Sequence, residues 1–256
     1  MSQNHPHRRI QVPSDAPFEL KPSPGKGLGV FATRRISEGA MVLKEKPLFI
    51  IWKPHEEIRE EDIRTAFQQL APTQKGQFLC LRGNASKPFK NMSRVLAEKS
   101  FALSNSVNDQ RKDSPSHGMF LLHSRFNHSC IPNSKIPTSD EASQETLTSF
   151  ATRNIVAGEE ITLCYNTDFE MRTRLDRRQE LRFVCDCKAC LPGTLFQRLS
   201  DIRRSLIRGL QYLTLGKDLD GRRQDSDASP IIFHGGLKRA AEEFKIPLSD
   251  RFVFIF

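Results

Sequence analysis

Short runs of hydrophobic residues between turn residues occur in the first part of the chain and again after residue 145. Val30–Phe31 and Met41–Leu43 flank the turn Ser37–Gly39, and the apolar run Leu48–Ile51 follows Pro47. Runs of this length between turn signals are typical of β-strands. The pattern therefore predicts strands over residues 29–51 and a second β-rich block over residues 146–165.

Hydrophobic residues at helical spacing lie between and after these blocks. Ile63, Phe67 and Leu70 are three or four positions apart and predict a helix over residues 60–70. A second helix is predicted over 91–99, whereas the polar run 108–118 predicts a loop. From Phe196 to Leu213 apolar residues recur every three or four positions, which predicts a helix whose apolar stripe joins the core. A last short helix is predicted around residues 237–244.

One nine-residue pattern occurs twice. Phe31–Gly39 reads FATRRISEG and Phe150–Gly158 reads FATRNIVAG. Each copy predicts a strand end, a turn that closes on glycine and an apolar strand beyond it, because glycine tolerates the positive φ of tight turns. Two copies are too few for a repeat array. They predict two similar β-corners around one core.

Composition narrows the class of protein. The chain has 256 residues, of which 38% are hydrophobic, and no apolar run approaches the roughly 20 residues of a membrane helix. Residues 1–17 are polar and predict a disordered leader instead of a secretory signal. We therefore expect an intracellular protein whose six cysteines are thiols or metal ligands.

The net charge of +9 is concentrated in one segment. Residues 171–210 contain ten Arg or Lys against four Asp or Glu. Such a segment is compatible with binding to nucleic acid or an acidic partner, but it offers few aromatics for base stacking. A solvated helix face is the favoured interpretation.

Three cysteines in six residues form a C-x-C-x2-C cluster, made by Cys185, Cys187 and Cys190. This spacing in a chain of intracellular type indicates zinc, and structural zinc takes four ligands. Cys164 lies in an apolar strand and Cys80 in a mixed segment, whereas Cys130 lies in a polar loop made rigid by Pro132. We select Cys130 as the fourth ligand.

Four features, in this order along the chain, resemble those of SET-domain lysine methyltransferases. They are KGLGVFA at Lys26–Ala32, NHSCIPN at Asn127–Asn133, GEEITLCY at Gly158–Tyr165, and the cysteine cluster, which resembles the post-SET zinc site. The resemblance covers residues 18–192. It is greatest to the branch with a helical insert that is related to MYND-containing SET proteins, although the MYND finger is absent here.

The resemblance implies an α+β architecture and a domain organisation. The expected fold is the β-rich SET fold, in which small sheets surround a pseudoknot that brings the His128 loop to the Tyr165 segment. The expected parts are a disordered leader (1–17), a SET domain (18–180) with a helical insert (about 54–118), a post-SET zinc segment (181–192) and a C-terminal helical region (193–256).

The resemblance also implies a cofactor site and a catalytic residue. S-adenosylmethionine is the expected methyl donor, and Tyr165 matches the family's catalytic tyrosine. The residues that match cofactor-binding positions are Lys26, Gly27, Leu28, Asn105, Asn127, His128, Tyr165 and Phe183. One position departs from the family pattern, because Leu181 stands where relatives often carry a second aromatic residue.

The function predicted from this resemblance is methyl transfer to the ε-amine of a protein lysine, on a histone or another protein, with one structural zinc. The alternative is a catalytically weak or inactive SET-derived interaction module, which Leu181 favours. A nucleic-acid-binding zinc protein ranks third. We expect a monomer that acts on a protein substrate, in the nucleus or cytoplasm, without membrane or nucleic-acid partners.

Overall fold

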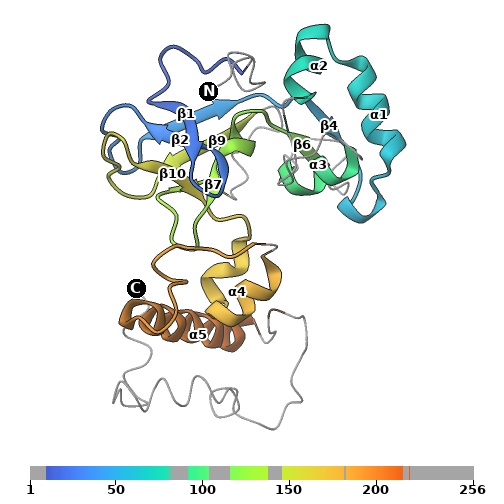
Figure 1. Cartoon of the computed structure of the whole chain (residues 1–256). Coiled ribbons are helices and arrows are strands. Elements are labelled where there is room, and N and C mark those ends of the chain that lie inside the picture. The colour runs from blue at the N-terminus through green and yellow to red at the C-terminus, as the bar shows by residue number, and fades with distance from the viewer. Residues whose placement is uncertain are drawn as a thin grey trace. The chain divides into compact units, whose positions relative to one another are not determined.

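The computed structural model describes residues 10–79, 81, 92–103, 116–137, 146–181, 183–215 and 219. These residues form two compact units (Figure 1). The first contains the described residues up to Asn127 together with Pro132–Leu163, and the second contains His128–Ile131 and the described residues from Cys164 onward. Several predictions fall outside the described residues. They concern residues 1–9 of the predicted leader (1–17), Cys80, Asn105 and the predicted helix around 237–244.

The first unit is built from three small sheets (Figure 1). One sheet has the order β1-β2-β10-β7. Only the first residue of β7, Asn127, belongs to this unit. The other two have the orders β3-β9-β8 and β4-β6-β5. Their bounds are β1 Phe18–Ser23, β2 Gly27–Ala32, β3 Met41–Glu45, β4 Phe49–Ile51, β5 Ser100–Leu103, β6 Ser116–Met119, β7 Asn127–His128, β8 Ser134–Lys135, β9 Leu147–Ala151 and β10 Glu160–Leu163.

The two β-rich blocks predicted from the sequence are confirmed, but the predicted loop over 108–118 is wrong at its end. Ser116–Gly118 belong to β6, which pairs antiparallel with β4 and with β5. The sequence SHGM of this strand carries little of the hydrophobic pattern that marks strands. Its strand conformation follows from hydrogen bonding on both sides, which is a tertiary effect.

The two similar corners pair with each other across a local pseudo-twofold axis. Ile36 and Ile155 exchange both backbone hydrogen bonds at 2.9 Å. Ala32 N donates to Glu159 O, and the equivalent Ala151 N donates to Ala40 O, each at 2.9 Å. Both turn glycines have positive φ, +76° at Gly39 and +84° at Gly158. The prediction of two similar corners around one core is confirmed, with both isoleucines buried in that core.

Helices of the first unit pack beside the sheet β4-β6-β5. They are η2 His55–Glu57, α1 Glu60–Gln69, α2 Pro72–Leu79, α3 Met92–Lys99 and the short η3 His123–Arg125. Ile63 of α1 and Phe78 of α2 are fully buried. The Glu60 carboxylate accepts hydrogen bonds from the backbone N–H groups of Met92 and Ser93 and so caps α3. The predicted helices over 60–70 and 91–99 are thus confirmed, and the class is α+β as predicted.

The second unit is mainly helical and contains η4 Thr167–Met171, α4 Arg174–Glu180 and α5 Leu195–Leu215. Thr173 caps α4 by accepting a hydrogen bond from Asp176 N. The predicted long helix after Cys190 is therefore confirmed. No helix in the described ranges is long and apolar enough to cross a membrane.

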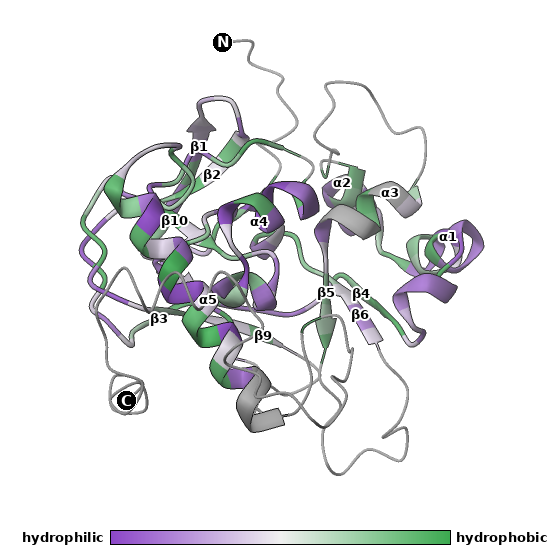
Figure 2. Ribbon diagram, turned by 90° about the horizontal axis from the view of Figure 1, so that it is seen from below, coloured by the Kyte–Doolittle hydropathy of each residue, from purple (hydrophilic) through white to green (hydrophobic). Residues whose placement is uncertain are grey.

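The prediction that the apolar stripe of α5 joins a core is wrong. Phe196 is 45% exposed, and the residues of the stripe from Leu199 to Leu210 are only half-buried. Figure 2 shows hydrophobic and hydrophilic bands in alternation along α5. Over residues 195–211 of α5, for which burial is described, the buried positions are instead Ser200, Arg204 and Ser205, because Arg204 turns inward to bind backbone carbonyl groups.

Candidate functional site

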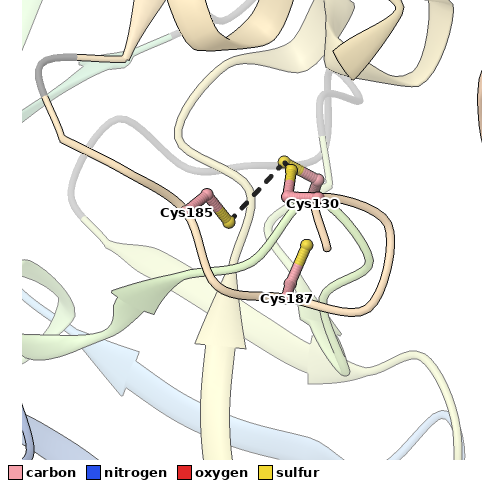
Figure 3. Close-up of side chains that lie close together, drawn as sticks. Cys130, Cys185 and Cys187 are labelled. Atoms are coloured by element: carbon pink, nitrogen blue, oxygen red, sulfur yellow. Dashed lines mark hydrogen bonds between the residues drawn. The ribbon is translucent and has the colours of Figure 1, made fainter. Parts of the chain in front are cut away.

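Four cysteine side chains converge in the second unit (Figure 3). Cys130 comes from the His128–Ile131 segment, and the other three from the segment after α4. The sulfur atoms of Cys130, Cys185, Cys187 and Cys190 all lie within 4.8 Å of one another. The Sγ of Cys130 is 3.5 Å from that of Cys190 and 3.9 Å from that of Cys185. The structure thus brings together the four residues that the sequence selected.

This donor set fits a tetrahedral zinc ion. Sulfur atoms bound to zinc at about 2.3 Å in a tetrahedron lie about 3.8 Å apart. Crowding also makes the thiols unequal. Hydrogen bonds with the other three sulfurs, together with burial, raise the pKa of Cys130, whereas the hydrogen bonds of Cys187 with its three neighbours lower the pKa of Cys187. Four thiolates within 4.8 Å of one another repel each other, so all four can be ionised together only around a cation.

His128 bridges the cysteine cluster and the Tyr165 backbone. Its Nδ1 accepts a hydrogen bond from Tyr165 N at 3.1 Å. The ring proton of the neutral imidazole must then be on Nε2, which lies 3.2 Å from the Cys130 sulfur and donates to it. His128 is 4% exposed, and both of its ring nitrogens are engaged within the protein.

An aromatic cluster surrounds His128. Its ring lies 5.1 Å from that of Tyr165, 5.6 Å from Phe169 and 5.8 Å from Phe183. The Tyr165 and Phe183 rings meet edge to face at 6.3 Å. Tyr165 is 49% exposed, so its ring is anchored on one side and accessible on the other. The predicted proximity of the His128 loop and the Tyr165 segment is confirmed.

Leu181 does not take the place of the missing aromatic residue in this cluster. It ends α4, where its N–H bonds to Arg177 O, and its side chain packs against the buried group of Cys130, Phe169, Ala189 and Cys190. The side chain thus contributes to the cysteine-rich core of the second unit.

The remaining predicted cofactor residues lie in the first unit. Lys26 is the last residue of the turn between β1 and β2, and Gly27, with φ +83°, and Leu28 are the first two residues of β2. Asn127 Nδ2 donates to Leu28 O at 3.2 Å and to Glu160 Oε1 at 2.7 Å. The structure therefore joins the opening motif to Asn127 through a side-chain amide. Asn105 lies outside the described residues.

Sequence reasoning missed the residues that hold these motifs in place. Asn133 is 2% exposed; its Nδ2 donates to Glu159 Oε1 and to Glu160 O, and its Oδ1 accepts from Thr162 N. Asn133 thereby ties the NHSCIPN motif to the GEEITLCY motif. The available signal was its position inside the first motif, where a buried amide needs several partners.

The comparisons with known proteins agree with this geometry. Residues 27–166, more than half of the chain, match the SET domain. The chain belongs to the SET-domain family.

Among its relatives, histone-lysine N-methyltransferase set5 of Schizosaccharomyces pombe is 29% identical to the SET protein over 199 residues, or 73% of this chain and 54% of that one. Histone-lysine N-methyltransferase SET5 of Meyerozyma guilliermondii is 40% identical over 76 residues, 28% of this chain and 15% of that one. A SET and MYND domain-containing protein of Dictyostelium discoideum is 38% identical over 85 residues, 32% of this chain and 23% of that one. The SET protein spans about half the length of the first relative and less of the others.

Gly29 permits the contact between Glu160 and Asn127. A Cβ at this position would lie against Glu160 Oε1 and 3.0 Å from Asn127 Nδ2. We expect Gly29→Ala to displace the Glu160 side chain and to destabilise the protein by about 1–3 kcal/mol. Chemical denaturation of the variant measures this loss. Gly76→Ala is the matched control, because a Cβ there meets nothing within 4 Å, and equal stability of the two variants would contradict the expectation.

Proposed function

We propose that the SET protein transfers a methyl group from S-adenosylmethionine to the ε-amine of a lysine in a protein substrate. The observation that carries this proposal is the environment of Tyr165. Tyr165 is half-exposed, and its ring packs on His128 and Phe183. The Tyr165 backbone N–H is hydrogen-bonded to His128, which in turn contacts the cysteine cluster. A tyrosine whose ring is held in this way is suited to orient an incoming amine through its hydroxyl.

The role of Tyr165 follows from the chemistry of the substrate. A free lysine amine has a pKa near 10.4 and is protonated at neutral pH, so it must lose a proton before it acts as a nucleophile. Aromatic walls disfavour the charged amine by desolvation, and the Tyr165 hydroxyl then aligns the neutral form. S-adenosylmethionine supplies, when bound, a methyl group already activated on a sulfonium. The protein has mainly to exclude water and orient the amine.

We assign cofactor binding to two groups of residues. Lys26, Gly27 and Leu28, with Asn127, would hold the amino-acid part through backbone atoms of the turn and the Asn127 amide. His128 and Phe183 would contact the remainder. Because both His128 ring nitrogens have protein partners, the polar contacts of His128 with the cofactor would come from its main chain. Asn105 remains a proposed contact on its motif alone.

We assign a structural role to zinc at Cys130, Cys185, Cys187 and Cys190. With four sulfur ligands no position is left for a substrate or water. Cys130 would link the His128–Ile131 segment to the segment after α4 and so support His128 beneath Tyr165. In domain terms, we propose a SET domain over 18–180 with an insert at about 54–118, a post-SET segment at 181–192 and a C-terminal region at 193–256.

We propose a histone as the substrate and the nucleus as the place of action, since two relatives are named histone-lysine N-methyltransferases. The second candidate function is a SET-derived interaction module without catalysis. The observation that favours it is Leu181, whose side chain packs with the cysteines and leaves the second aromatic position of the family unfilled.

Calorimetry with S-adenosylhomocysteine tests the cofactor site and separates the two candidates. We expect one molecule to bind per chain, and Asn127→Ala to weaken binding at least about tenfold, because the variant loses the amide that joins Leu28 to Glu160. Asn154→Ala, at an exposed turn, is the control and should bind as the wild type does. If folded, zinc-loaded protein does not bind S-adenosylhomocysteine, the methyltransferase proposal is excluded and the interaction module is the function that remains.

A further inference from the structure

Two arginines of the basic segment over residues 171–210, Arg177 and Arg204, are buried. We propose that Arg177 and Arg204, which turn inward from α4 and α5, are positioning residues that offset the negative charge of the metal-bound thiolates and fix the two segments that carry them. This inference rests on the proposed zinc site. It assigns the two arginines to metal retention.

Arg177 holds the Cys185–Cys190 segment. Its side chain is fully buried, with 0% exposure. Nη2 donates to Ala189 O at 2.9 Å and to the Cys190 sulfur at 3.5 Å. Nη1 donates to Arg172 O and forms a 3.5 Å ion pair with Asp201. Among the described residues, Arg177 Nε has no hydrogen-bond partner. Direct hydrogen bonds therefore offset only part of the charge of this buried guanidinium group.

Arg204 holds the Cys130 segment from the other helix. It is 7% exposed, and its Nη2 donates to Cys130 O at 2.6 Å. Nη1 donates to Phe169 O, and Nε to Ser200 Oγ at 3.1 Å. All three of these acceptors are neutral. No carboxylate forms an ion pair with Arg204 among the residues that the structure describes, so its charge calls for another anion nearby.

The charges at the site favour the thiolates as that anion. Arginine keeps its proton at every physiological pH, and burial of an uncompensated guanidinium is costly. A zinc ion with four thiolates would carry a net charge of −2. Two of the four cysteines, Cys130 and Cys190, are buried, and they are the ones that Arg204 and Arg177 contact. Asp201 offsets part of the Arg177 charge, but at Nη1, whereas Nη2 faces the Cys190 sulfur. The thiolate centre and the two guanidinium groups therefore stabilise each other.

Each arginine has an exposed arginine as its neighbour in sequence, which supplies matched controls. Arg178 lies beside Arg177 and Arg203 beside Arg204, and both are exposed. The test measures zinc affinity of the full chain by competition with a chromophoric chelator. The test variants are Arg177→Met and Arg204→Met, and the controls are Arg178→Met and Arg203→Met. A further variant, Arg177→Lys, keeps the positive charge but lacks the several N–H donors of the guanidinium group.

We expect the two buried substitutions to weaken zinc affinity about 10–100-fold and the two exposed ones to leave it within about twofold. Arg177→Lys should lie nearer to the wild type than Arg177→Met does. A purely structural arginine would lower the melting temperatures of zinc-loaded and chelated protein equally and leave the zinc affinity unchanged.

Unchanged affinity in Arg177→Met and Arg204→Met would overturn this inference, with the zinc site intact. If Arg177→Met does not fold, Arg204→Met and Arg177→Lys carry the test. A wild-type chain that binds no zinc would overturn the zinc site itself and the inference with it. The two failures are thus distinguishable.

Discussion

Replacement of Tyr165 by phenylalanine is expected to lower kcat for lysine methylation about 100-fold or more, since misalignment of a reacting group alone has effects of this size. The phenylalanine ring keeps the contacts with His128 and Phe183, and the backbone N–H keeps its bond to His128. Only the hydroxyl is removed. Binding of S-adenosylhomocysteine should therefore stay within about threefold of the wild type, and single-turnover kinetics should assign the loss to the chemical step.

The control for this variant is replacement of the chain's other tyrosine, Tyr212, by phenylalanine. We expect Tyr212→Phe to keep full activity. Equal kcat for Tyr165→Phe and the wild type would remove Tyr165 from the reaction. A large loss of cofactor affinity in Tyr165→Phe would instead make the tyrosine a binding residue.

Removal of zinc is expected to destabilise the second unit and to abolish methyl transfer. Among the residues that the structure describes, the buried hydrophobic group of this unit is small: it contains Cys130, Phe169, Ala189 and Cys190, and two of these four are proposed metal ligands. Loss of the ion leaves four crowded thiols and two buried arginines, of which only Arg177 has a carboxylate partner, Asp201, among the described residues. At a zinc concentration about 1,000-fold above Kd the ion contributes about 4 kcal/mol to stability.

Metal analysis and thermal unfolding with and without chelator measure this effect. We expect one zinc per chain and a clear fall in melting temperature on chelation. Cys187→Ser should reproduce the effect, whereas Cys164→Ser, a half-buried cysteine outside the cluster, should keep its zinc. A chelated protein with an unchanged melting temperature and full activity would refute a structural metal.

Much of the fold was predictable because its signals are local. The two β-blocks follow from apolar runs between turns, and the paired corners follow from a pattern that the chain repeats within itself. The convergence of the four cysteines followed from spacing and from the coordination number of zinc. In each case the relevant information lies within a few neighbouring residues or in a simple chemical requirement.

The remaining features depend on tertiary contacts that composition does not reveal. Strand β6 is polar in sequence and becomes a strand because β4 and β5 flank it. In the sequence, Arg177 and Arg204 resemble residues of a solvated helix face. In the structure both are buried and donate hydrogen bonds to carbonyl groups of other segments. The same inward turn of Arg204 explains why the apolar stripe of α5 is not the buried face. The Asn127–Glu160 bond depends on the missing side chain of Gly29.

The most direct test of the central claim is methyl transfer itself. Zinc-loaded protein is incubated with isotopically labelled S-adenosylmethionine and core histones, and in parallel with a cell extract, and labelled residues are mapped by mass spectrometry. We predict label on lysine ε-amines with the wild-type protein and a loss of about 100-fold or more with Tyr165→Phe. Label at the same level in both proteins, or on residues other than lysine, would contradict the assignment of this SET protein as a lysine methyltransferase.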